Sequence, residues 1–134
     1  MKNLLLCIIC ASALLLQSCG DETNCTAGLG GNLTVAAQLK HHTLVIENHA
    51  GYPDTVFVKF NTQDLPGTSP ADYDTFFVGE AGEDHVHMAG LKCGDYFLYA
   101  AGFDSTINER VTGGIPFSTA QEDGEVSQVI PVTE

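Results

Sequence analysis

Two histidines separated by one residue, His85 and His87, are the side chains of this chain best suited to chemistry. They belong to a segment that reads as a short strand, with Val86 and Met88 on one face. Because side chains alternate along a strand, both imidazoles project from the other face. That spacing suits a transition metal such as Zn, Cu or Fe, completed by a carboxylate or a third histidine. The same pair also fits a solvated face of an edge strand.

Other candidate ligands surround this pair in the sequence. Glu83 and Asp84 directly precede it. His41 and His42 lie at a strand end or turn, and His49 follows the next predicted strand. Because adjacent residues on a strand point to opposite faces, we expect that His41 and His42 do not join one site.

Short alternating segments separated by Gly, Pro and Asp must position these residues. No segment shows a helical period over eight or more residues. The predicted strands are 33–40, 43–47, 55–61, 74–78, 84–88, 95–101, 109–111 and 125–132, the seventh ending at Gly113-Gly114. This pattern predicts an all-β fold, a seven- or eight-stranded antiparallel Greek-key sandwich.

The first residues of the chain form a secretion signal. Lys2 supplies a basic start, an apolar run covers Leu4 to Leu16, and a small residue, Ser18, follows. The apolar run is shorter than the roughly 20 residues that span a bilayer as a helix. The sequence Leu16-Gln17-Ser18-Cys19 resembles the lipobox of bacterial lipoproteins. The resemblance implies cleavage before Cys19, which becomes an acylated, palmitate-bearing N-terminus.

This resemblance divides the chain into three parts. Residues 1–18 are the cleaved signal, 19–32 a lipidated and flexible tether rich in Gly, Asp, Asn and Thr, and 33–134 the folded domain. The expected location is the cell envelope, anchored to the outer membrane through the lipid and facing the periplasm or the surface. Asp21 and Glu22 resemble the short acidic signals that send some lipoproteins to the cell surface.

The charge of the chain excludes some partners. The formal net charge is −12, and without Lys2 there are 17 acidic residues against four basic ones, Lys40, Lys59, Lys92 and Arg110. A domain this acidic is not expected to bind nucleic acid or to adsorb directly to anionic lipid headgroups. The charge fits a role in solubility, and it also fits the capture of cations.

The five cysteines have three expected roles. Cys7 and Cys10 leave with the signal, and Cys19 is the lipid site. Cys25 and Cys93 remain in an oxidising compartment, where we expect a disulfide between them. Closing so long a loop stabilises a fold by about 4 kcal/mol. The alternative is two free thiols.

The most distinctive core segment runs from Val86 to Leu98. Gly90 ends a strand, Leu91 fills the core, Gly94 permits a tight turn and Tyr96 begins the next strand. A tyrosine after such a corner can turn its hydroxyl group back onto the backbone. The segment resembles the Leu-x-x-Gly-x-Tyr turn of transthyretin-like and collagen-adhesin B-type domains. The resemblance implies a transthyretin-like sandwich of a family that has no assigned activity.

Two enzyme families of related fold provide a comparison. Intradiol dioxygenases hold ferric iron with two tyrosines and a His-x-His pair, which Tyr52, Tyr73, His85 and His87 resemble. Neither a basic residue nor a proline precedes His85, in contrast to that family. Hydroxyisourate hydrolase, also transthyretin-like, ends in Tyr-Arg-Gly-Ser, whereas this chain ends in Pro-Val-Thr-Glu.

The sequence therefore favours a non-catalytic binding or structural module with no cofactor and an unidentified protein or glycan partner. No serine lies in a Gly-x-Ser-x-Gly context. The alternative is a metal-binding protein that uses His85 and His87, with an iron site like that of intradiol dioxygenases as its catalytic form.

Overall fold

The computed structural model describes residues 25–134. Segments in which apolar and polar residues alternate form long strands. The predicted signal, Cys19 and the acidic pair Asp21-Glu22 lie outside the described residues. Strand β1 begins at Leu29, four residues before the start predicted from the alternation of Leu33 and Val35.

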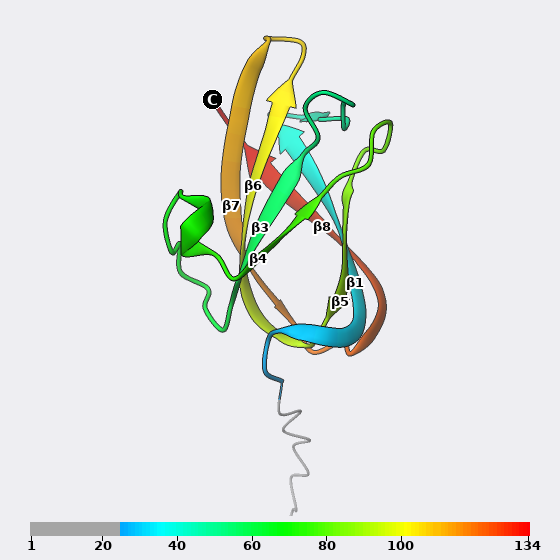
Figure 1. Cartoon of the computed structure of the whole chain (residues 1–134), viewed down its shortest axis with the longest axis vertical. Helices are drawn as coiled ribbons and strands as arrows, with labels where there is room; N and C mark the ends of the chain where they lie inside the picture. The colour runs from blue at the N-terminus through cyan, green and yellow to red at the C-terminus, as the bar shows by residue number, and fades with distance from the viewer. Residues whose placement is uncertain (1–24) are drawn as a thin grey trace, which may run out of the picture.

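The strands form two four-stranded sheets that pack face to face (Figure 1). The first sheet contains β1 Leu29–His41, β2 Leu44–Val45, β5 Val86–Leu91 and β8 Asp123–Val132. The second contains β4 Thr75–Val78, β3 Thr55–Phe60, β6 Gly94–Asp104 and β7 Glu109–Thr119, in this spatial order. Within the described part of the chain, a 3-10 turn at Pro70–Asp72 is the only helical element. The predicted all-β sandwich is confirmed.

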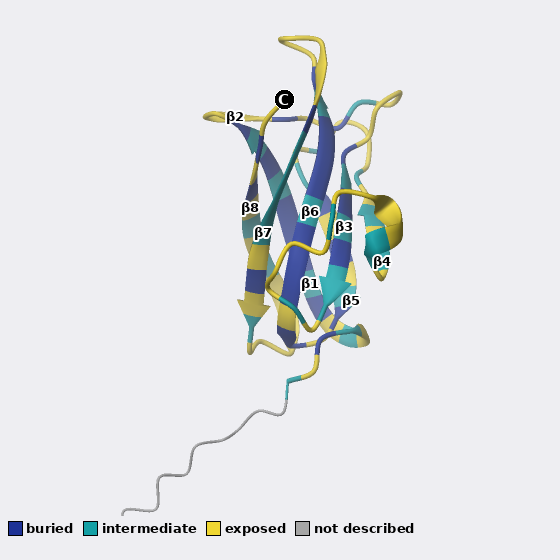
Figure 2. Cartoon of the chain, turned by 90° about the vertical axis from the view of Figure 1, so that its left-hand side faces the viewer, coloured by how far each residue is buried: buried dark blue, intermediate teal, exposed yellow. Residues whose placement is uncertain are grey.

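The core lies between the sheets (Figure 2), and burial follows a period of two most clearly along β3. The inward side chains of β1 are all fully buried: Leu33, Val35, Ala37 and Leu39. The facing sheet contributes further buried side chains, among them Val56, Val58, Leu98, Ala100 and Val111. Each large apolar side chain buried in this way stabilises the fold by about 1.5–3 kcal/mol.

One strand pair departs from the antiparallel prediction. β8 runs parallel to β1, with a register that extends from Asn32 beside Asp123 to His41 beside Val132. Parallel neighbours need a long crossover connection. Here the whole of β2 to β7 separates the two strands, so the connection is the rest of the domain. The first sheet is therefore mixed.

The pair Gly113-Gly114 does not end β7, in contrast to the prediction. Both glycines lie inside the strand, which continues to Thr119. A Cβ at Gly113 would lie 3.0 Å from the Cα of Val132, and one at Gly114 would lie 2.7 Å from Phe97 Cε1. The glycines thus permit close packing against β8 and against an aromatic ring, a role that a turn-based interpretation misses.

The corner between β5 and β6 has the predicted form. Leu91 is fully buried, and Gly94 has a φ of +142° that disfavours any other residue. The Tyr96 hydroxyl donates a hydrogen bond of 2.6 Å to the Lys92 carbonyl and accepts one of 3.2 Å from the Gly28 N–H. The expectation that the tyrosine turns back onto the backbone is confirmed.

The disulfide between Cys25 and Cys93 is also present. It joins the segment before β1 to the corner after β5. The same segment is held by a backbone hydrogen bond of 3.0 Å from Lys92 N to the Gly28 carbonyl, and Ala27 is buried. Residues 25–28 therefore pack against the sandwich.

Replacing Tyr96 by Phe should lower the free energy of unfolding by about 1–2 kcal/mol, because two partly buried hydrogen bonds to the backbone are lost. Urea unfolding followed by circular dichroism measures this loss. Tyr99→Phe is the matched control, since the Tyr99 hydroxyl makes no hydrogen bond within residues 25–134 and its ring is half-buried. Equal losses in the two variants would contradict the role assigned to the Tyr96 hydroxyl.

Candidate functional site

His85 and His87 project together from the outer face of the first sheet. Val86 and Met88, which alternate with them, are fully buried. The Nε2 atoms of the two histidines lie 2.8 Å apart, and the His87 side chain is 45% exposed. The prediction that both imidazoles share one face is confirmed.

Glu83 brings a carboxylate to the same point. Its Oε2 atom lies 3.8 Å from the Nε2 atoms of both His85 and His87. This oxygen is buried and has no hydrogen-bond partner in the described residues. Ligands around a tetrahedral zinc ion lie about 3.3 Å apart, given bond lengths of about 2.0–2.2 Å. An ion therefore fits among the three atoms after shifts of less than about 1 Å.

Further carboxylates stand behind the histidine rings. His85 Nδ1 donates a hydrogen bond of 2.7 Å to Asp84 Oδ1, and this bond holds the pKa of Asp84 below its usual value. Gln38 Nε2 donates a bond of 2.9 Å to the other Asp84 oxygen. Glu125 Oε2 lies 3.7 Å from His87 Nδ1. With Nδ1 of His85 held as a donor, its Nε2 is the nitrogen that presents a lone pair to a metal ion.

Asn48 fixes the backbone that carries these ligands. Its Nδ2 donates hydrogen bonds of 3.0 Å to the carbonyls of both Glu83 and His85, and its Oδ1 accepts one of 2.8 Å from Asp54 N. Asn48 is 2% exposed. The sequence indicates only a turn here and gives no sign of this role, because the two carbonyls that Asn48 holds lie 35 and 37 residues away.

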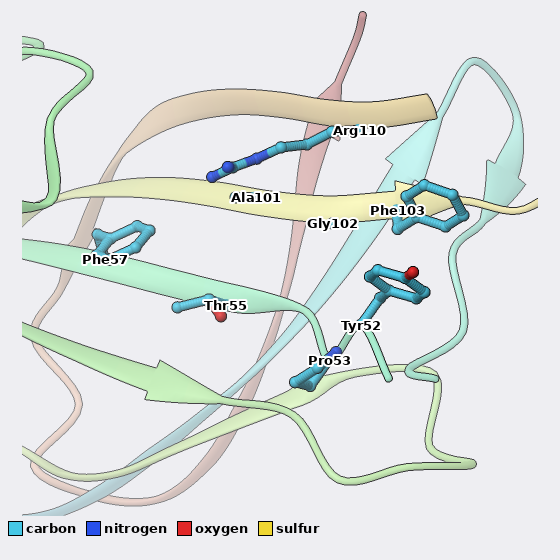
Figure 3. A pocket seen from close by; sticks show the side chains of 8 residues that line it. All are labelled: Tyr52, Pro53, Thr55, Phe57, Ala101, Gly102, Phe103 and Arg110. Atoms are coloured by element: carbon cyan, nitrogen blue, oxygen red, sulfur yellow. The ribbon is translucent and has the colours of Figure 1, made fainter. Parts of the chain in front are cut away.

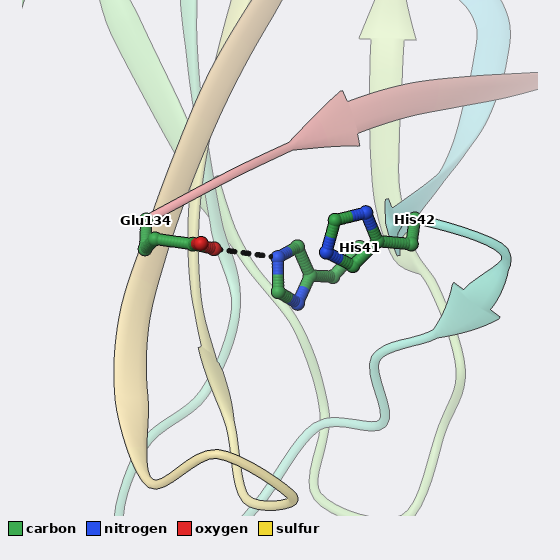
Figure 4. Close-up of side chains that lie close together, drawn as sticks. All are labelled: His41, His42 and Glu134. Atoms are coloured by element: carbon green, nitrogen blue, oxygen red, sulfur yellow. Dashed lines mark hydrogen bonds and ion pairs between the residues drawn. The ribbon is translucent and has the colours of Figure 1, made fainter.

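A second histidine cluster contains His41, His42 and Glu134 (Figure 4). The expectation that His41 and His42 cannot share a site is wrong. β1 ends at His41, and His42 has a φ of +54° in the turn that follows, so the strict alternation of a strand does not apply. The rings lie 4.3 Å apart between centroids.

Two carboxylates hold the buried His41 ring. Its Nδ1 lies 2.7 Å from Asp104 Oδ2, and its Nε2 lies 2.8 Å from Glu134 Oε2. The hydrogen bond to Asp104, and secondly that to Glu134, raise the pKa of His41 above its usual value. Hydrogen bonds from Thr106, followed by that from His41, lower the pKa of Asp104 to about 2.

The structure does not bring the two tyrosines of an iron site to His85 and His87. The Tyr73 hydroxyl donates a hydrogen bond of 2.7 Å to the Gly67 carbonyl, and its ring stacks on Tyr99 of the second sheet. Tyr52 stacks on Phe103, also of the second sheet. The third group at the histidine pair is a glutamate, so the expected likeness to the intradiol dioxygenases is not found at this site.

An aromatic pocket lies on the outer face of the second sheet (Figure 3). The stacked rings of Tyr52 and Phe103, with centroids 4.8 Å apart, form one end, and Phe57 lies at the other. Arg110 of β7 extends over the floor of this cavity of about 400 Å³. The pocket therefore combines apolar rings with one positive charge, on the sheet opposite the histidine clusters.

Asp54 is a buried carboxyl group that sequence reasoning did not single out. It is fully buried, and neither carboxyl oxygen has a hydrogen-bond partner in the described residues. Loss of solvation raises the pKa of Asp54 to about 7. In the sequence it looked like an ordinary turn aspartate after Pro53.

Asp54→Asn should make the stability of the protein less dependent on pH. The folded-state pKa lies above the unfolded value of about 3.9, so the folded protein holds this proton more tightly. The stabilisation by the proton is complete below about pH 4 and is lost as the pH rises to about 7 and beyond. The melting temperature of the wild type should therefore fall more between pH 5 and pH 8 than that of the variant.

Thermal unfolding at the two pH values measures this difference. Asp64→Asn is the control, because Asp64 is an exposed loop residue. The titration of His41 is common to all three proteins and cancels in the comparison. If the melting temperature of Asp54→Asn depends on pH as steeply as that of the wild type, the raised pKa assigned to the buried Asp54 carboxyl group is wrong.

Comparisons of the chain with protein-family models, with curated proteins and with solved structures find no match. In residues 25–134 no helix has the length and apolar character needed to cross a bilayer. The family resemblances drawn from the sequence therefore stay predictions.

Proposed function

We propose that this chain is a lipid-anchored protein of the cell envelope that binds a divalent transition-metal ion through Glu83, His85 and His87. The observation that carries the proposal is the convergence of two imidazole nitrogens and a buried, unpaired carboxylate oxygen on one point. A carboxylate behind His85 orients that ring for coordination, as outer carboxylates do in metal proteins.

The donor atoms determine the class of ion. Two imidazole nitrogens and one carboxylate oxygen suit Zn²⁺ or Cu²⁺, whereas Ca²⁺ and Mg²⁺ prefer sites made of oxygen atoms. The formal charge of −12 attracts cations toward the surface. We propose binding rather than catalysis, because the cluster lies on an open strand face where His87 is 45% exposed.

The lipobox resemblance supports the proposed location. Cys19 stands six residues before Cys25, which the disulfide joins to the corner after β5. A lipid on Cys19 would therefore attach the sandwich at the end where β1 begins. Two packed sheets and the Tyr96 corner support the finer proposal of a transthyretin-like fold.

A second candidate function is binding of a protein or glycan partner by the aromatic face of the second sheet. The observation that favours it is the exposure of two aromatic side chains. Tyr52 (62% exposed) lines the pocket that contains Arg110, and Phe76 (61% exposed) lies 6.2 Å between ring centroids from Phe57 at the other end of that pocket. Exposed aromatic side chains are enriched at recognition surfaces.

Replacing His85 and His87 together by Ala should remove about one equivalent of bound Zn²⁺, because the two nitrogen ligands of the site are lost. Isothermal titration of the metal-stripped protein with Zn²⁺ measures the stoichiometry. His49→Ala is the control, since His49 belongs to neither cluster. A double variant that keeps all the zinc bound by the wild type would overturn the proposed site.

Replacing Cys19 by Ala should release the protein from the membrane, because the acylation site is lost. Cell fractionation followed by immunoblotting measures the distribution. Cys10→Ala, a change of the same kind within the apolar run of the signal, should leave the protein in the membrane fraction. A Cys19→Ala protein that still partitions with membranes would be evidence against the lipid anchor.

A further inference from the structure

Two adjacent histidines converge because the chain turns between them. His41 is the last residue of β1, and His42 occupies the left-handed region with a φ of +54°. Residues other than glycine enter this region rarely, and histidine is among the side chains that do so most often. The effect of this conformation is to bring the His42 ring beside the His41 ring (Figure 4).

The His41 ring is held in one orientation before any ion binds. Asp104 Oδ2 accepts from Nδ1 at 2.7 Å, and Asp104 is itself fixed by hydrogen bonds of 2.8 Å and 2.6 Å from the N–H and hydroxyl of Thr106. His41 is 4% exposed, so solvent does not compete for the ring. Nε2 is left to face Glu134. A carboxylate behind a histidine, with the second nitrogen facing outward, is the arrangement that surrounds bound zinc ions.

Glu134 is placed at Nε2 by the strand that precedes it. Thr133 exchanges two backbone hydrogen bonds, of 2.8 Å and 2.9 Å, with Thr112 of β7. The Glu134 Oε2 atom then lies 2.8 Å from His41 Nε2. The third ligand, His42, is exposed and makes no side-chain hydrogen bond within the described part of the chain, so its ring is available to close on an ion.

We propose that His41, His42 and Glu134 form a second site for a divalent transition-metal ion, with Zn²⁺ as the ion to test. One nitrogen or oxygen atom from each of the three residues lies within 4.8 Å of the others. Movement of the exposed His42 ring brings these atoms toward the roughly 3.3 Å separation around tetrahedral zinc. The ion takes the place of the proton between His41 Nε2 and Glu134, this proton is released to solvent, and Asp104 stays hydrogen-bonded to Nδ1.

The His41 site differs from the Glu83 cluster in which parts of the chain an ion would connect. Glu83, His85 and His87 lie within five residues of one another, whereas Glu134 is 93 residues from His41. An ion at the second site therefore links the turn after β1 to the segment after β8. Because such a site exists only in the folded chain, its occupation stabilises the whole fold. The ligands of the Glu83 cluster are close enough in sequence to hold an ion in the unfolded chain as well, so an ion there should raise the melting temperature less.

The test uses the metal-stripped full chain, Zn²⁺ titration and thermal unfolding with and without Zn²⁺. His42→Ala removes an exposed ligand and leaves the buried His41 in place, and Glu134→Gln is the second variant. Both should lose one equivalent of zinc and most of the rise in melting temperature that zinc produces in the wild type. His87→Ala should lose the other equivalent and keep most of that rise. His49→Ala is again the control.

The outcomes separate the two sites. If His42→Ala and Glu134→Gln keep the wild-type zinc stoichiometry and the wild-type rise in melting temperature, the second site is wrong, whatever His87→Ala does. If they lose an equivalent and the rise while His87→Ala loses nothing, the second site stands and the proposed function of the Glu83 cluster fails. If the wild type does not bind zinc tightly, both proposed sites are wrong.

Discussion

The alternation of side chains along β1 is the constraint on which the rest of this structure depends. Leu33, Val35, Ala37 and Leu39 form the inward face of the strand, and β5 and β8 pair with its two edges. The same register places His41 inward at the end of the strand. A polar ring at the end of a hydrophobic face needs partners, because an unpaired buried polar group costs about 1–3 kcal/mol. The histidine network at this end of the sandwich is thus a consequence of the strand that builds the core.

The partners of His41 are placed by the same alternation of side chains along β6 and β8. On β6 the buried side chains of Tyr96, Leu98 and Ala100 continue in register to Asp104, and on β8 those of Ile130 and Val132 lead to Glu134. Three core-facing rows therefore finish in ionisable residues that meet at one end of the sandwich. The other end is closed differently, by the disulfide and by the Tyr96 hydroxyl. Near the histidine end, beside Gly102, Asp54 is a buried carboxyl group without such partners, and its raised pKa is the result.

The alternation and turn residues within single segments of the sequence predict the features that depend on one segment. The strand faces, the corner from Gly90 to Tyr96 and the shared face of His85 and His87 each follow from residues close in sequence. The parallel β1–β8 pair, the role of Asn48 and the approach of Glu134 depend on registers between distant segments, which periodicity does not contain. The sequence predicts a strand end or turn at His41 and His42, but not the positive φ of His42 that brings the two rings together. A usable signal did exist for His41, since extending the row from Leu33 to Leu39 by two residues places it in the core.

The two histidine clusters have the same ligand types but differ in their relation to the fold. At the Glu83 cluster all ligands come from one short segment, and the strand already holds them on one face. An ion there would connect only neighbouring residues of the chain. At the His41 cluster the ligands come from the turn after β1 and from the segment after β8, and an ion adds a link between them, as a structural metal does. An ion that binds only the folded chain stabilises it according to its affinity, whereas an ion that the unfolded chain also binds stabilises the fold less. Because the Glu83 ligands lie within five residues of one another and the His41 ligands do not, occupation of the proposed His41 site would be coupled more strongly to folding.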